Sequence, residues 1–413
     1  MDFRRLWMAD AVSQLGTRMT FLAAPLLAVL HLHASTFEVA LVRTFETLGA
    51  LLFGLLAGAI VDRLRCRPVL LATDIGRAVL MLTVPAAALF GVLALWQLYL
   101  VMFLVGVLTV FFDVAHQSYL PRLLPPAELA GANAKLAANA SVAALGGASA
   151  GGYLVQLLTA PFVFVLDALS MVWSALWIRS IRHREPPVER APDRHLGREI
   201  AEGVGFVFRH PLLRPIALST ATVVFAQSAG MAVSVVFLVR DIGLSAGVIG
   251  VLGTIGLVGA LVSAGVASRL VGRIGQARAL VFGTLALGPA FLVQAFTTPG
   301  WGLAWFVASG LVASFCIVLT NVVQATIRQT ICPPALLGRV GATMEFMTWG
   351  IMPPASILGG AMAAVTDTRT TLLVSGAVAC LAVGWLIASP LRSSPAVSDV
   401  RSAGSAKLSY PCD

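Results

Sequence analysis

The sequence predicts an all-α integral membrane protein whose twelve transmembrane helices form two pseudo-symmetric bundles of six. The 413 residues are 58% hydrophobic and only 11% charged, whereas a soluble domain carries about 25% charged residues. The apolar residues gather in about twelve runs, and a helix needs about 20 such residues to cross a bilayer. Landmarks of the first half also recur in the second half, which indicates an internal duplication.

Each apolar run predicts one span. The turns between most runs are short, which is typical of antiparallel helix neighbours. The expected spans cover residues 5–30, 36–61, 69–91, 95–119, 129–158, 160–181, 212–239, 246–268, 277–297, 300–326, 336–364 and 370–390.

The recurring landmarks are a proline pair and a glycine pair. Pro125-Pro126 follows the fourth run, and Pro333-Pro334 follows the tenth. Gly151-Gly152 lies in the fifth run, and Gly359-Gly360 lies in the eleventh. Both offsets are 208 residues (333 − 125 and 359 − 151). Secondary transporters are built from such repeats and bind substrate between them near the bilayer midplane. We expect bundles over residues 1–182 and 212–391, a linker over 183–211 and a disordered cytoplasmic tail over 392–413.

The linker is the longest polar segment between two spans. Its first part is rich in proline and mixed charge, while Ile200, Val204 and Val207 recur at helical spacing in its second part. This spacing predicts a short amphipathic helix on the inner membrane surface. A plain linker with incidental spacing is the alternative.

Arginines mark alternate turns of the chain. The opposite turns hold only Arg240 and Arg369, each close to an aspartate. Loops rich in Lys and Arg face the cytoplasm, so we expect both termini in the cytoplasm and the protein in the plasma membrane. The arginine-rich set comprises Arg4, Arg5, Arg63, Arg65, Arg67, Arg122, Arg179, Arg182, Arg184, Arg269, Arg273, Arg278, Arg328 and Arg339.

Several function classes are excluded by the same residues. The net charge of +9 resides in short turns without interleaved aromatic residues, so we expect no nucleic-acid partner. The five cysteines are scattered, with no pair at metal-ligand spacing. The sequence contains no phosphate-binding Gly-x-x-x-x-Gly-Lys motif, no nucleophile elbow and no His-Glu-x-x-His motif. We therefore expect no enzyme activity, no cofactor and no metal site.

The turn GAIVDRLRCRP, from Gly58 to Pro68, carries the most characteristic pattern. Gly58 followed by Asp62-Arg63, with Arg67 near the end, resembles the signature loop between spans two and three of the major facilitator superfamily. Cys66 stands where that family usually has the first of two basic residues. In the family this loop takes part in gating, and the resemblance implies a cytoplasmic gate here. Its expected members are Gly58, Asp62, Arg63, Arg67, Asp74 and Arg77.

Further stretches extend the resemblance from about residue 3 to residue 392. Gly147 to Gly152 resembles the antiporter motif Gly-Pro-x-x-Gly-Gly, with Ala148 in place of the proline. Stretches such as YLPRLLPPAELAGANA and LLGRVGATMEF resemble the branch that contains enterobactin exporters and macrolide efflux pumps. That branch often has an acidic residue where Thr17 stands here.

Charged residues inside the spans are the candidates for proton coupling or for lining a cavity. Arg18 and Glu46 lie about 21 Å and 24 Å above the cytoplasmic ends of their helices. Charges at that depth need a partner or an aqueous cavity. The pair is either a static packing element or a functional pair that handles substrate or protons.

A second layer of charge lies lower. Asp113 and Arg77 are both about 14 Å up their helices, and His116 shares the helix face of Asp113. Asp113 with His116 forms a second candidate proton site, because histidine titrates near neutral pH. The alternative is an inner-surface ion pair between Asp113 and Arg77. Glu345, inside the eleventh span, is the third candidate.

Small residues and prolines indicate where helices pack closely or bend. Gly147, Gly151 and Gly152 allow span five to approach another helix, and Pro353 with Pro354 removes backbone hydrogen bonds from span eleven. These helices either move as rocking elements during transport or pack tightly without moving.

The sequence favours a proton-coupled antiporter that exports a lipophilic small molecule, such as a drug, an antibiotic or a siderophore, by alternating access. Glu46 or Asp113 would take a proton from outside and release it inside. The alternatives are an importer of a small metabolite in the same fold and a non-transporting receptor or assembly partner. The expected partners are the substrate, protons and the lipid bilayer, and the chain is expected to be a monomer.

Overall fold

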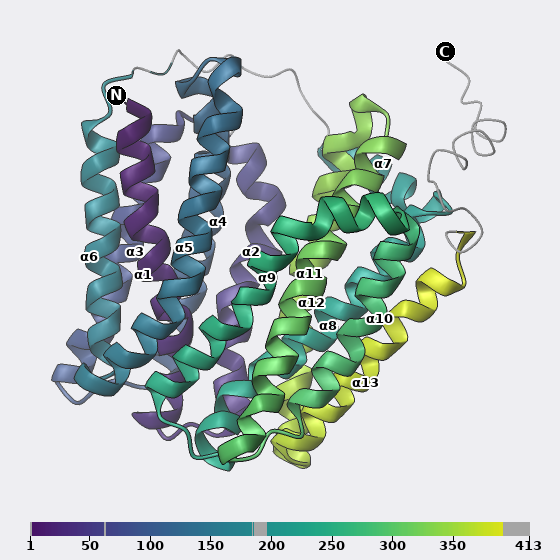
Figure 1. The fold of residues 1–413 in the computed structure, drawn as a ribbon. Coiled ribbons are helices and arrows are strands. Elements are labelled where there is room, and N and C mark those ends of the chain that lie inside the picture. The colour runs from purple at the N-terminus through teal and green to yellow at the C-terminus, as the bar shows by residue number, and fades with distance from the viewer. Residues whose placement is uncertain (1, 62, 184, 186–195, 391–413) are drawn as a thin grey trace. The chain divides into compact units, whose positions relative to one another are not determined.

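The computed structural model describes residues 2–61, 63–183, 185 and 196–390. Thirteen α-helices make up this part of the chain, and twelve of them correspond to the twelve predicted spans (Figure 1). The first six are α1 (Asp2–Leu30), α2 (Thr36–Val61), α3 (Cys66–Leu89), α4 (Leu95–Leu123), α5 (Pro126–Leu158) and α6 (Ala160–Ser180). The last six are α8 (Leu213–Val236), α9 (Ala246–Ile274), α10 (Gln276–Gln294), α11 (Leu303–Ile331), α12 (Pro334–Val365) and α13 (Thr368–Ile387).

Nine of the described helices are long and apolar enough to cross a membrane. The other three long helices are α1, α2 and α12, which carry Arg18, Glu46 and Glu345 respectively. The structure also supports the internal repeat, since α5 begins at Pro126 and α12 begins at Pro334, 208 residues later. All-helical architecture and multiple membrane spans are thus common to the sequence prediction and the structure.

Several helices continue past the predicted ends, and the extra residues include arginines. The prediction ended the eighth span before Arg269, yet α9 runs on to Ile274. Likewise α11 passes Arg328 and ends at Ile331. A helix satisfies its own backbone hydrogen bonds wherever it lies, and long arginine side chains reach out to water from a helix end. The apolar run therefore measures the membrane-embedded part and underestimates the helix.

The first six helices pack on one another in a set of neighbour pairs. Helix α1 packs against α5 and α6, α2 packs against α4, and α3 packs against α4 and α6. Glycines permit the α2–α4 crossing, because a Cβ atom at Gly49 would lie 2.5 Å from the backbone nitrogen of Val107. A Cβ atom at Gly106 would collide with the carbonyl oxygen of Glu46.

The glycines of α5 face two different neighbours. A Cβ atom at Gly147 would collide with the Cβ of Arg18, and one at Gly151 would lie 2.9 Å from the carbonyl oxygen of Met19. Gly152 instead lies against the first turns of α9, where a Cβ atom would collide with the Ala246 carbonyl. The close approach predicted for this helix is therefore present, and its role in rocking stays a prediction.

Replacing Gly151 by Ala is expected to destabilise the protein by about 1–3 kcal/mol, because the added methyl group overpacks the α1–α5 contact. Gly146 is the matched control, since the nearest atom to its added Cβ is 3.8 Å away. Gly146→Ala should leave the midpoint of thermal unfolding in detergent unchanged or slightly raised. Equal midpoints for both variants would contradict the close contact.

The contacts between Cα atoms divide the chain into two compact units. The first unit contains the first six helices together with Met231–Thr254 and Met352–Thr371. The second unit contains His195–Gly230, Ile255–Ile351 and the end of the chain from Leu372. One boundary crosses α12 between Ile351 and Met352, although α12 is helical through both prolines. The bundle boundaries and the bend at Pro353 and Pro354 stay predictions, and the predicted tail over 392–413 lies outside the described residues.

The linker contains the expected helix, α7 (Leu196–Arg209). It packs on the start of α12, where a Cβ atom at Gly203 would lie 2.8 Å from the Arg339 carbonyl oxygen. Glu202 forms an ion pair with Arg339, and Val207 is buried in the cluster that includes Leu213 and Val340. The helix is therefore fixed to α12 by packing and charge. Its position on a membrane surface stays a prediction.

Candidate functional site

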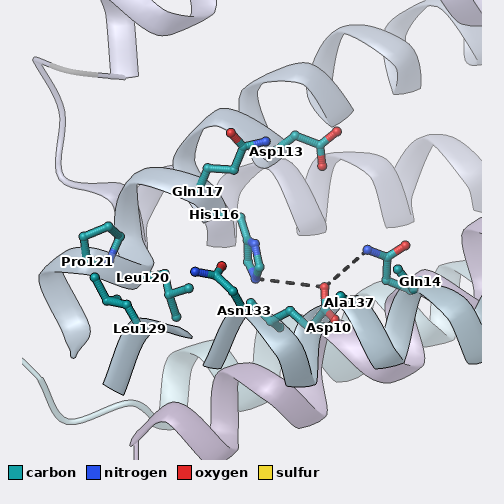
Figure 2. A pocket seen from close by; sticks show the side chains of 12 residues that line it. Asp10, Gln14, Asp113, His116, Gln117, Leu120, Pro121, Leu129, Asn133 and Ala137 are labelled. Carbon is teal, nitrogen blue, oxygen red and sulfur yellow. Dashed lines mark hydrogen bonds and ion pairs between the residues drawn. The ribbon is translucent and has the colours of Figure 1, made fainter. Parts of the chain in front are cut away.

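A cavity of 570 Å³ lies within the first unit, between α1, α4 and α5 (Figure 2). Its lining is mixed, with carboxylates, amides and a histidine beside leucines and alanines. A volume that fits a small molecule, combined with a few polar groups, is typical of a ligand site. The lining residues are Asp10, Gln14, Asp113, His116, Gln117, Leu120, Pro121, Leu129, Asn133, Leu136, Ala137 and Ala140.

Asp10 connects the three helices at one end of the cavity. Its carboxylate accepts a hydrogen bond of 2.9 Å from Nδ2 of Asn139 on α5 and one of 3.4 Å from Nε2 of Gln14. Nε2 of His116 on α4 lies 4.0 Å from Oδ1 of Asp10. Figure 2 shows the imidazole and the Gln14 amide converging on this carboxylate from opposite sides. Asp10 is 6% exposed, so these partners compensate a charge held away from water.

His116 is held in place by stacking on its own helix. Its ring stacks on that of Phe112, with ring centroids 5.8 Å apart and an interplanar angle of 14°. Its Nε2 atom is buried and makes no hydrogen bond within the described part of the chain. The imidazole thus faces Asp10 at a separation too long for a hydrogen bond.

Asp113 occupies a different environment in the same cavity. The side chain is exposed to the cavity, and it forms no hydrogen bond or ion pair with the described residues. Figure 2 shows its carboxylate pointing away from the His116–Asp10 pair. The two candidates Asp113 and His116 therefore share a cavity, while the closest charged partner of His116 is Asp10.

Arg77 does not form the expected pair with Asp113. Its Nη2 lies 2.5 Å from Oδ1 of Asp74, one helical turn earlier on α3, and both side chains are almost fully buried. Ser174 on α6 donates a 2.7 Å hydrogen bond to the other Asp74 oxygen, and the guanidinium lies over the ring of Phe112 at 4.3 Å. The alternative interpretation, an ion pair between Asp113 and Arg77, is therefore not found among the described residues, because Arg77 pairs within its own helix.

The predicted gate residues fall into separate environments. Asp62 lies outside the described residues, and Arg63 is exposed. A Cβ atom added at Gly58 would have no atom within 4 Å. Asp74 and Arg77 form the buried pair inside α3. The gating role of the turn therefore stays a prediction.

Glu185, which the sequence analysis did not single out, binds the start of α3 at Cys66 and Arg67. The carboxylate of Glu185 accepts 2.7 Å hydrogen bonds from the backbone N–H groups of Cys66 and Arg67. Arg122, at the end of α4, donates a 3.3 Å hydrogen bond to the same carboxylate, whose side chain is 3% exposed. Arg67 also donates from Nη2 to the carbonyl oxygen of Arg179. Glu185 therefore caps α3, whose N-cap residue makes no side-chain capping bond.

Arg18 and Glu46, expected to form a pair or to share an aqueous cavity, do not pair with each other among the described residues. Glu46 pairs with Arg43 at 2.5 Å, and the Arg43 guanidinium lies 3.8 Å from the ring centroid of Phe21. Arg18 is exposed, and its Cβ atom lies against Gly147 of α5. Glu345, the third candidate, is exposed on α12.

The sequence analysis did not identify Asp10 as a functional candidate. The position of Asp10 along its helix, compared with that of His116, could have indicated it. Asp10 follows Arg4 by six residues, and His116 precedes Arg122 by six residues. Both are therefore about 9 Å from the arginine-marked end of their helices. Matched depth on neighbouring helices predicts contact, provided that the helices are known to be neighbours.

A family model of the Major Facilitator Superfamily matches residues 6–353. The uncharacterized MFS-type transporter YfiS of Bacillus subtilis is 26% identical over 381 residues, which cover 89% of this chain and 88% of YfiS. The multidrug efflux pump Tap of Mycolicibacterium fortuitum is 29% identical over 373 residues, which cover 87% of this chain and 88% of Tap.

Solved structures with the same fold include transporters of different kinds. A mutant of the nucleoside transporter NupG has a TM-score of 0.76 at 13% identity, covering 94% of this chain and 99% of NupG. A bacterial homologue of the iron transporter ferroportin in an inward-facing state has a TM-score of 0.74 at 16% identity, covering 94% and 98%. The fold, the extent of the family match and the membrane-spanning helices agree, and the chain belongs to the major facilitator superfamily of membrane transporters.

Proposed function

We propose that this transporter is a proton-coupled antiporter that exports lipophilic small molecules across the plasma membrane, with both termini in the cytoplasm. Its similarity to the multidrug efflux pump Tap supports export of drug-like compounds. Antibiotics and siderophores are the substrate types to test first, and the chain works as a monomer by alternating access of its two halves.

The proposal rests on the position of Asp113, a carboxylate that lines the cavity. A coupling carboxylate must bind and release a proton during each cycle, so a permanent ion pair would hinder it. Glu46 has such a pair with Arg43, and Asp74 has one with Arg77. Asp113 lines the cavity without a hydrogen-bonding or ion-pairing partner among the described residues.

The pair of Asp10 and His116 supports the same role from the other end of the cavity. A proton on His116 would turn the 4.0 Å approach to Asp10 into an ion pair. The charged groups that act on Asp113 are Arg77, Asp10 and Arg18. The protonation state of the cavity thus depends on both carboxylates and the imidazole together.

Asp113→Asn is expected to abolish substrate accumulation driven by a pH gradient in inverted membrane vesicles. Exchange of labelled for unlabelled substrate without a gradient should continue, because the amide still permits the conformational change but carries no proton. A panel of lipophilic dyes and antibiotics serves as substrate, and proton release on substrate addition gives a second readout.

Three matched variants sharpen this test. Glu46→Gln should retain gradient-driven transport, since Glu46 is paired with Arg43. Glu345→Gln should also retain it, and Glu128→Gln removes an exposed carboxylate from the first turn of α5 as a control. Undiminished accumulation in Asp113→Asn would contradict the coupling role, and gradient-driven movement in the opposite direction would establish import.

A further inference from the structure

The cavity lining carries carboxylates and no Lys or Arg among its described residues. The two carboxylates are those of Asp10 and Asp113. The arginines that act on Asp113 lie outside this lining. Arg77 is paired with Asp74, and Arg18 is exposed on α1. Lys135, the nearest lysine in sequence, instead lies over the ring of Phe3 at 5.8 Å. A concave site lined by charge of one sign concentrates ligands of the opposite sign. The cavity therefore favours a cation.

The lining also separates into a polar and an apolar part. Figure 2 shows His116 and Gln14 gathered around Asp10, whereas Leu120, Pro121 and Leu129 lie together on another side. Leu136 and the alanines of α5 extend the apolar surface. A ligand that satisfies both parts carries its charge at one end and an apolar body at the other.

The volume argues against a small inorganic ion as the occupant. A cavity of 570 Å³ is the size of a site for a drug-sized molecule. Within the described residues there is no group of three His, Cys, Asp or Glu side chains arranged to hold a metal ion. Two carboxylates in different positions can instead neutralise an organic cation, with Asp113 free to approach its charge.

We infer that this cavity is a binding site for amphipathic organic cations, with the positive charge at Asp113 and the apolar body against the leucines of α4 and α5. The inference rests on the proposed function for its place in a transport cycle, and it names the substrate class. A proton and an organic cation then compete for one negative site, so that binding of one favours release of the other. The described residues that line the site belong to α1, α4 and α5.

The test is equilibrium binding of radiolabelled tetraphenylphosphonium to the purified full-length protein in nanodiscs, without any gradient. Saturable binding is expected, and Asp113→Asn should weaken it by about tenfold, roughly 1.4 kcal/mol. Neutral triphenylphosphine oxide should fail to displace the probe. Acidification should weaken binding, because protonation of Asp113 removes a negative charge from the cavity and protonation of His116 adds a positive one.

Two further variants separate charge from shape. Ala137→Phe narrows the cavity without changing its charge and should also weaken binding, whereas Glu128→Gln, outside the lining, should leave it unchanged. Size-exclusion profiles check that each variant is folded. Displacement by the neutral compound, or equal affinity in folded Asp113→Asn and Glu128→Gln, would overturn the inference.

Binding and transport are read separately. Absence of saturable binding together with Asp113-dependent, gradient-driven export would overturn the cation site and leave proton-coupled export standing. Saturable, Asp113-dependent binding together with gradient-independent transport would support the cation site and overturn proton coupling.

Discussion

Replacing Asp74 by Ala is expected to lower the free energy of unfolding by about 3–5 kcal/mol. The substitution leaves the Arg77 guanidinium buried without its carboxylate, and both side chains are at most 3% exposed. Ser174 would lose its acceptor as well. The expected readout is a large fall in the midpoint of thermal unfolding and in the yield of folded protein in detergent.

A double variant distinguishes loss of charge balance from loss of packing. Asp74→Leu with Arg77→Met replaces the buried pair by apolar side chains of similar size, and such replacements are often neutral. The double variant should therefore be more stable than Asp74→Ala alone. If both variants unfold at the same temperature, the pair contributes through its volume and the electrostatic account is wrong.

Glu185→Ala is the second substitution with a large expected effect, a loss of roughly 2–3 kcal/mol. Two backbone N–H groups at the start of α3 and the Arg122 guanidinium would lose a shared charged acceptor. Hydrogen exchange measured by mass spectrometry should accelerate in the first turn of α3, at Cys66 and Arg67.

Two comparisons make this result specific. Glu185→Gln keeps a neutral acceptor oxygen and should accelerate exchange less than Glu185→Ala, and Glu128→Ala removes an exposed carboxylate at the start of α5. Unchanged exchange at the start of α3 in Glu185→Ala would show that the cap does not hold this turn.

The twelve spans were predictable because length and hydropathy decide which segments cross a bilayer, and neither depends on the arrangement of the helices. The start of α5 at Pro126 and of α12 at Pro334 was visible in the repeat. The ends at Ile274 and Ile331 were not, because hydropathy falls at an arginine while the helical hydrogen bonds continue.

The candidate site was predictable only in part. Depth along a helix follows from residue counting, which placed Asp113 and His116 at similar heights. Which neighbour a side chain faces depends on helix rotation and packing, and residue counting contains neither. For that reason Asp10 and Glu185 were missed, and the partners of Glu46 and Arg77 proved to be residues of their own helices.

The attachment of Glu185 to the start of α3 sets a mechanical limit on the transporter. The linker is held on the first six helices at Glu185, and α7, beginning at Leu196, is held on α12 by Glu202 and Gly203. Eleven peptide units join the Cα atoms of Glu185 and Leu196, which a fully extended chain separates by at most about 40 Å. The two attachments therefore act as the ends of a short tether. Any movement that separates the Cα atoms of Glu185 and Leu196 by more than this distance must first release Glu185 or α7.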